Sequence, residues 1–108
     1  METFAVVLTN LPDRDAAFAL AHALVERRLA ACANVLAGCS SVYRWKGAVE
    51  SADEVPVLIK TRLSLYPQVE QAIRELHPYE LPEIVVLPVQ AGLQGYLDWI
   101  GAETSGNG

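Results

Sequence analysis

The sequence has little positive charge and no long hydrophobic run. Its 108 residues include 8 lysines and arginines against 13 aspartates and glutamates, for a net charge of −5. Nucleic-acid-binding domains carry a basic footprint, so we expect no nucleic-acid partner. No apolar segment approaches the roughly 18 residues that a membrane-spanning helix needs, and the N-terminus shows no basic segment followed by a hydrophobic one. We therefore expect no membrane partner and no export.

The sequence is also poor in cysteine. Its two cysteines, Cys32 and Cys39, are separated by seven positions. In one extended strand this spacing corresponds to roughly 23 Å, which is too far for a disulfide bond. Reduced thiols are typical of the cytoplasm, so the pattern predicts a cytoplasmic protein.

Apolar residues, by contrast, are abundant and indicate a folded domain that associates with other chains. They make up 52% of the sequence, which excludes a disordered chain. A chain of this length fits one domain, expected over residues 1–103, with a flexible tail at 104–108. Because a small domain cannot bury so large an apolar share by itself, the composition also predicts oligomerisation.

The spacing of apolar residues predicts alternating strands and helices. Strands favour alternating or continuous short apolar runs, and helices favour apolar residues at every third or fourth position. The segments follow in this order: strand 3–9, helix 13–29, strand 31–45 with a break at Gly38, strand 49–61, helix 65–76, strand 83–89 and helix 93–100. Lys46 and Gly47 predict a hairpin turn, and Pro56 predicts a bulge or a locally unpaired edge.

This order predicts an α+β protein, a ferredoxin-like β-α-β-β-α-β sandwich with a short C-terminal helix. Both long helices are expected on one face of an antiparallel sheet. The other face and the edges of the long hairpin then remain apolar and unpaired. We expect them to contact further copies of the chain.

Residues that could bind a metal or a small ligand are few. No phosphate loop, dinucleotide fingerprint or nucleophile elbow is present, so we do not expect an enzyme. Cys32 and His77 offer a thiolate and an imidazole, which suit copper or zinc. Two such ligands are too few for a closed structural zinc site, and ordinary packing remains an alternative for Cys32.

The segment 77–83 is the densest polar cluster of the sequence. Two prolines stiffen this segment, so it suits either a rigid helix-to-strand connector or a ligand site. In the second reading His77, Tyr79 and Glu83 act together with Trp45 and Lys60 of the hairpin.

Five blocks in one colinear order resemble the CutA family of divalent-cation tolerance proteins. They are Ala30–Val35, Ser41–Gly47, Leu58–Thr61, His77–Ile84 and Tyr96–Ile100. The resemblance implies a homotrimer whose hairpins pair edge to edge, and a role in tolerance of divalent metal ions with copper as the proposed ligand. A small-ligand regulatory trimer like the PII signalling proteins is the alternative.

The resemblance also assigns roles to single residues. Cys32 and His77 match the positions proposed for metal binding. The residues expected around the cleft between subunits are Trp45, Lys60, Tyr79, Glu83 and Trp99. Cys39 is not part of the family pattern and receives no role.

Overall fold

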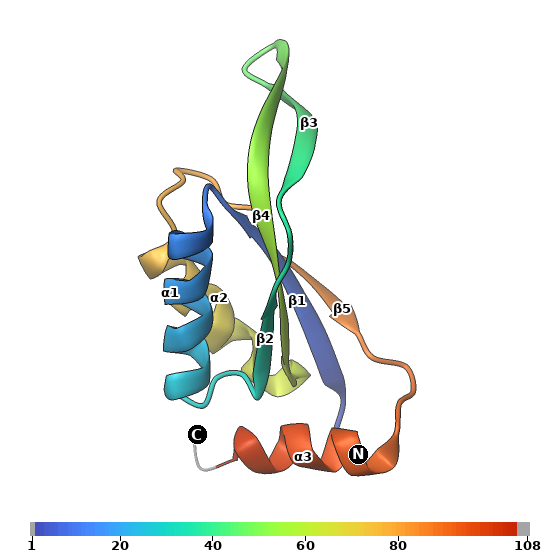
Figure 1. Cartoon of the computed structure of the whole chain (residues 1–108). Helices are drawn as coiled ribbons and strands as arrows, with labels where there is room; N and C mark the ends of the chain where they lie inside the picture. The colour runs from blue at the N-terminus through green and yellow to red at the C-terminus, as the bar shows by residue number, and fades with distance from the viewer. Residues whose placement is uncertain (1, 106–108) are drawn as a thin grey trace.

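Strands and helices follow one another in the order that the sequence predicts. The computed structural model describes residues 2–105 (Figure 1). The elements are β1 (Phe4–Leu11), α1 (Arg14–Glu26), β2 (Cys32–Val35), β3 (Cys39–Trp45), β4 (Ala48–Arg62), a 3₁₀ turn (Leu63–Leu65), α2 (Tyr66–Leu76), β5 (Val85–Pro88) and α3 (Gln94–Glu103). The predicted break at Gly38 lies between β2 and β3. This is the predicted ferredoxin-like α+β order.

The strands form one antiparallel sheet that continues into a two-stranded arm. The sheet order is β2-β4-β1-β5, and β3 pairs with the first half of β4, beyond the end of β2. We call β3 and this half of β4, residues 39–54, the hairpin arm; it projects away from the rest of the chain (Figure 1). Lys46 and Gly47 form its turn with φ of 49° and 84°, the backbone geometry that two-residue hairpin turns require.

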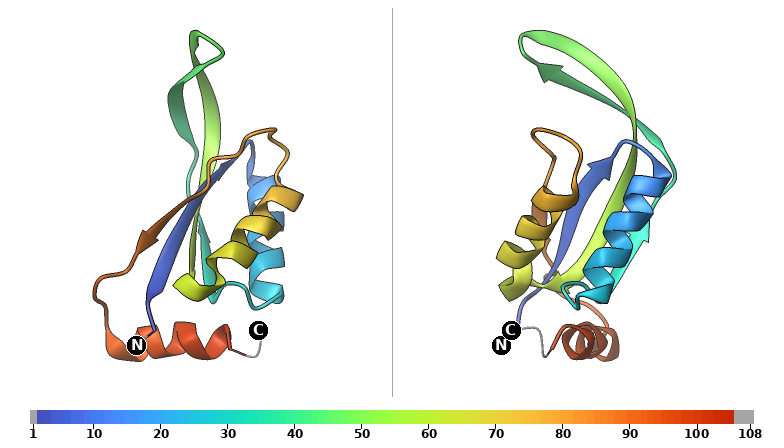
Figure 2. Two further views of the ribbon diagram at one scale, coloured as in Figure 1. Left: turned by 180° about the vertical axis from the view of Figure 1, so that it is seen from behind. Right: turned by 90° about the vertical axis from the view of Figure 1, so that its left-hand side faces the viewer.

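Helices α1 and α2 cover one face of the sheet (Figure 2). Alternate residues of β1 and β4 point into this layer, and they form the core with the apolar sides of both helices. The other residues form what we call the open face, which includes Val6, Leu8, Leu58, Lys60, Val85 and Leu87. Among residues 2–105 no helix is long and apolar enough to cross a membrane.

Pro56 marks the point where the neighbour of β4 changes from β2 to β3. Strand β4 continues through it, and the Pro56 carbonyl accepts a hydrogen bond from the Leu36 amide at 2.9 Å. In a strand the backbone nitrogen and carbonyl of one residue point to the same side, so the Pro56 nitrogen also faces Leu36. Because proline has no N–H, it cannot donate a hydrogen bond to the Leu36 carbonyl. The Leu36 carbonyl instead accepts from Arg14 Nη1 at 3.2 Å. The predicted local loss of pairing at Pro56 is therefore confirmed on this side.

The C-terminal segment is held more firmly than the sequence suggests. Thr104 is fully buried, and Arg62 donates to its hydroxyl at 2.9 Å and to its carbonyl at 2.6 Å. The prediction of a flexible tail is thus wrong at Thr104. Residues 106–108 of that tail lie outside the described part of the chain.

Two buried threonines of the core are expected to respond oppositely to replacement by valine. Thr61 donates to the Leu29 carbonyl at 2.6 Å, whereas the Thr9 hydroxyl has no partner among residues 2–105. We expect Thr9→Val to raise the free energy of unfolding by about 1 kcal/mol and Thr61→Val to lower it by about 1–2 kcal/mol. Urea unfolding at one protein concentration measures both changes. Equal losses in the two variants would contradict this assignment.

Candidate functional site

His77 lies buried at the end of β1, where it binds a strand carbonyl. It is 7% exposed, and its Nε2 lies 2.6 Å from the Asn10 carbonyl oxygen. The Tyr79 amide donates to the other ring nitrogen, Nδ1, at 3.1 Å. Because Nδ1 accepts, the neutral ring carries its proton on Nε2 and donates it to Asn10. Both nitrogens of His77 are therefore engaged within the chain.

Asn10 also anchors the far end of the connector 77–83. Its side-chain nitrogen donates to Glu83 Oε1 at 2.9 Å, and the rings of His77 and Tyr79 lie 4.7 Å apart. The structure thus brings together three of the predicted residues, His77, Tyr79 and Glu83. Sequence reasoning missed Asn10, although a polar residue at the end of an apolar strand is a usable signal for such an anchor.

Tyr79 connects this cluster to the base of the hairpin arm. Burial raises the pKa of Tyr79 above its ordinary value, and the negative charge of the Glu54 carboxylate raises it further. Tyr79 therefore serves near neutral pH as a hydrogen-bond donor and not as a base. The connector holds the arm and β1 in one unit.

Lys60, Cys32 and two aromatic residues form a second group, at the α3 end of the open face. Lys60 Nζ lies 5.7 Å from the centre of the Tyr96 ring, and Tyr96 lies 5.5 Å from Trp99. Cys32 is paired with Lys60 across the sheet, so both side chains point to the open face. The Cys32 thiol is partly buried, with Sγ 3.8 Å from Asn34 Oδ1.

Trp45 stands apart from both groups, at the tip of the hairpin arm. It pairs with Ala48, and the segment from Ala48 to Lys60 spans about 40 Å of extended strand. Lys46 Nζ lies 5.6 Å from the centre of the Trp45 ring. A single chain therefore does not bring the five predicted cleft residues together. Tyr79 and Glu83 lie in the connector, Lys60 lies beside Tyr96, which in turn lies beside Trp99, and Trp45 is at the tip of the hairpin arm.

The two predicted metal ligands are also separated in one chain. Cys32 and Val6 both pair with Lys60 of β4, so they lie at the same height in the sheet. His77 binds the Asn10 carbonyl, four residues further along β1. About 13 Å of strand lies between these two levels. Within residues 2–105 no group of three or more histidine, cysteine, aspartate or glutamate side chains could hold a metal ion.

Residues 5–103 match the family model of the CutA1 divalent ion tolerance protein. The chain belongs to the CutA family. It is 44% identical to the divalent-cation tolerance protein CutA of Thermus thermophilus, over 92% of this chain and 96% of that protein. It is also 44% identical to mouse CutA, over 82% of this chain and 50% of that protein, so this CutA chain spans about half the length of the mouse protein. The resemblance to the family is confirmed.

Solved CutA structures share the fold. The Thermus thermophilus structure has a TM-score of 0.91 at 44% identity and covers 97% of this chain and 100% of that one. Rice CutA1 has a TM-score of 0.93 at 35% identity and covers 96% and 95%. A CutA from Archaeoglobus fulgidus, described as a periplasmic divalent cation tolerance protein, has a TM-score of 0.90 at 31% identity and covers 97% and 100%. These relatives are CutA proteins and give no support to the PII-like alternative.

Proposed function

We propose that this CutA chain acts in tolerance of divalent metal ions as a cytoplasmic homotrimer that binds copper. The observation that carries the proposal is the family match over residues 5–103, together with relatives named divalent-cation tolerance proteins. Both cysteines are free, which suits the reducing cytoplasm. The absence of enzymatic activity stays a prediction.

The hairpin arm and the open face support assembly with further copies. Val42 of the arm is 74% exposed and Leu87 of the open face is 57% exposed. A two-stranded hairpin is marginally stable by itself, and an apolar sheet face favours contact with a partner. A closed ring of chains covers such edges, and the number three comes from the family resemblance. The contacts of this trimer are the hairpin arm, β5 and α3.

Cys32 is the primary copper ligand in this proposal. Its thiolate suits copper, and its place on the open face lets neighbouring copies supply further donors. His77 can join only if it releases the Asn10 carbonyl and the Tyr79 amide. Cys39, on the exposed arm, supplies a thiol control with no proposed role.

Copper titration of the whole protein against a competing chelator tests this proposal. We expect Cys32→Ser to weaken copper binding by about tenfold or more, because the soft thiolate ligand is lost. Cys39→Ser is the matched control and should bind like the parent. The double variant Cys32→Ser with His77→Ala should lose binding altogether. Parent-like affinity in this double variant would remove both ligand assignments.

A further inference from the structure

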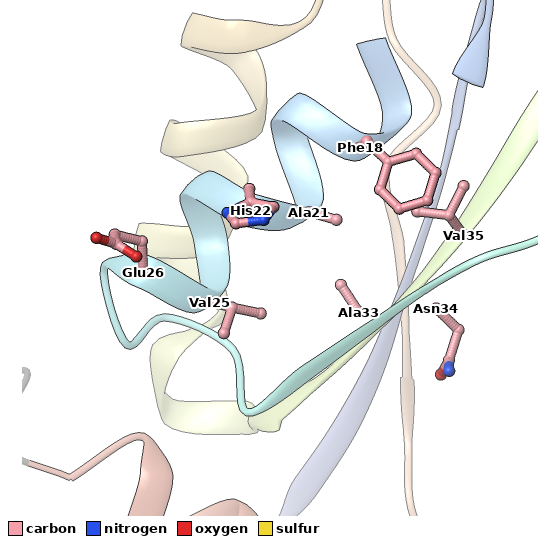
Figure 3. Close-up of a pocket in the computed structure, with 8 residues that line it drawn as sticks. All are labelled: Phe18, Ala21, His22, Val25, Glu26, Ala33, Asn34 and Val35. Atoms are coloured by element: carbon pink, nitrogen blue, oxygen red, sulfur yellow. The ribbon is translucent and has the colours of Figure 1, made fainter. Parts of the chain in front are cut away.

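The chain turns sharply after α1, at Arg28. Val25 and Glu26, which line a hollow between α1 and β2, lie in the last turn of this helix, and a short loop then leads to β2 (Figure 3). Arg28 has left-handed backbone geometry, with φ of 58°. Its amide donates to the Val25 carbonyl at 3.0 Å. The Leu29 amide donates to the Leu24 carbonyl at 3.0 Å, and these two bonds form a Schellman motif, whose left-handed position is usually glycine.

An arginine at this position costs free energy that glycine would not, because a residue with a Cβ is strained in the left-handed region. The Arg28 side chain makes two contacts that glycine could not make. Its Nη2 donates to the Ala102 carbonyl at 3.3 Å, and its Nε donates to the Ser105 carbonyl at 3.4 Å. Ala102 lies in the last turn of α3 and Ser105 lies just beyond the helix. Carbonyls at a helix C-terminus need donors from outside the helix and favour a cation.

Arg62 binds the same end of α3 from the end of β4. Its partly buried hydrogen bonds to the hydroxyl and carbonyl of Thr104 have lengths of 2.9 and 2.6 Å. Ile100, one turn before Thr104, is also buried. We call Arg28 and Arg62 the arginine clamp. Because the two arginines come from different elements, they fix both the position of the helix end and its rotation about the helix axis.

The clamped helix carries the aromatic residues of the second group. Tyr96 precedes Ile100 by one helical turn, so their side chains lie on the same side of α3. The Tyr96 ring lies 5.7 Å from Lys60 Nζ and 5.5 Å from the Trp99 ring. The other end of α3 is less firmly held, since Leu93 is 80% exposed and provides no side-chain cap. The position of the aromatic rings therefore depends on the clamped end.

We propose that the arginine clamp positions Tyr96 and Trp99 against Lys60, and that Arg28 occupies a position suited to glycine because its side chain is needed in the clamp. Lys60 and Trp99 belong to the cleft expected between copies, so the importance of the clamp for that cleft rests on the proposed function. The clamp itself involves no copper, and its test uses metal-free protein. A failure of the clamp and a failure of copper binding are therefore distinguishable results.

Hydrogen exchange and NMR of the metal-free whole protein test this proposal. Asparagine tolerates left-handed geometry but cannot reach α3, so Arg28→Asn is expected to fold. We expect amide exchange over residues 96–103 to become about threefold to fivefold faster in this variant, because two exposed hydrogen bonds to the helix end are lost. Arg62→Ala removes partly buried hydrogen bonds and should speed the exchange by about tenfold or more. In both variants the side-chain methylene protons of Lys60 should lose the ring-current shift caused by Tyr96.

Two further variants separate the clamp from backbone strain. Lys46 is the other non-glycine residue with positive φ among residues 2–105, and it lies at the tip of the hairpin arm. Lys46→Gly relieves similar strain and should leave α3 exchange and the Lys60 shift unchanged. Arg28→Lys keeps a long cationic donor and should give exchange rates between those of the parent and of Arg28→Asn. Exchange in Arg28→Lys as fast as in Arg28→Asn would contradict hydrogen bonding to the α3 carbonyls.

Three other results would overturn the proposal. One is parent-like α3 exchange and an unchanged Lys60 shift in both Arg28→Asn and Arg62→Ala. Another is equal acceleration of exchange in α3 and in the core strands β1 and β4, because this would reflect a general loss of stability. The third is faster α3 exchange in Lys46→Gly, because strain elsewhere in the chain would then control the helix.

Discussion

Replacing Leu87 by aspartate is expected to dissociate the assembly into single chains. Leu87 is 57% exposed in the isolated chain and pairs with Val6 on the open face. In the proposed trimer this side chain is buried against a neighbour, and an unpaired buried carboxylate costs several kcal/mol. The same position is solvent-exposed in a single chain, so the protomer keeps its fold. Light scattering at micromolar concentration measures the change in mass.

Val25→Asp is the matched control for this experiment. Val25 is an exposed aliphatic residue like Leu87, but it lies on α1, on the helix side of the sheet. It should therefore keep the mass of the parent protein. If Leu87→Asp also keeps the parent mass, the open face is not an interface between copies.

His77→Ala is expected to lower the free energy of unfolding by about 2 kcal/mol. The substitution leaves the Asn10 carbonyl without its donor and the Tyr79 amide without its acceptor. Both hydrogen bonds lie in a partly buried region, where unpaired polar groups are costly. Urea unfolding of parent and variant at equal protein concentration measures the difference.

Glu83→Ala separates the role of His77 from that of the connector as a whole. Glu83 accepts from the Asn10 side chain, but this hydrogen bond is exposed to solvent. Because water can replace it, the expected loss is within about 0.5 kcal/mol. A loss as large as that of His77→Ala would show that the site depends on the connector and not on the buried imidazole.

The order of the elements could be predicted from the sequence because each carries its own local signal. Gly38 marks the break between β2 and β3, and Lys46 with Gly47 marks the turn of the arm. The partners of the connector could not be predicted in the same way. The Asn10 carbonyl needs the His77 side chain because β5 begins only at Val85, opposite Leu8, and so leaves Asn10 beyond the ladder. The point where β5 stops pairing with β1 depends on how the whole chain packs, and no local sequence signal marks it.

The candidate site shows the same division between local and long-range information. His77, Tyr79 and Glu83 are close in sequence and stiffened by prolines, so their grouping could be predicted. Trp45 and Lys60 belong to one hairpin, yet the length of β4 places them far apart in one chain. Sequence spacing does not show whether another copy brings them together.

In the proposed trimer the hairpin arm and the open face are completed by two further copies of the chain. The mass of the native protein in solution, measured by light scattering at micromolar concentration, tests it most directly. We expect three times the chain mass of 11.7 kDa. A folded protein with the mass of one chain would contradict it.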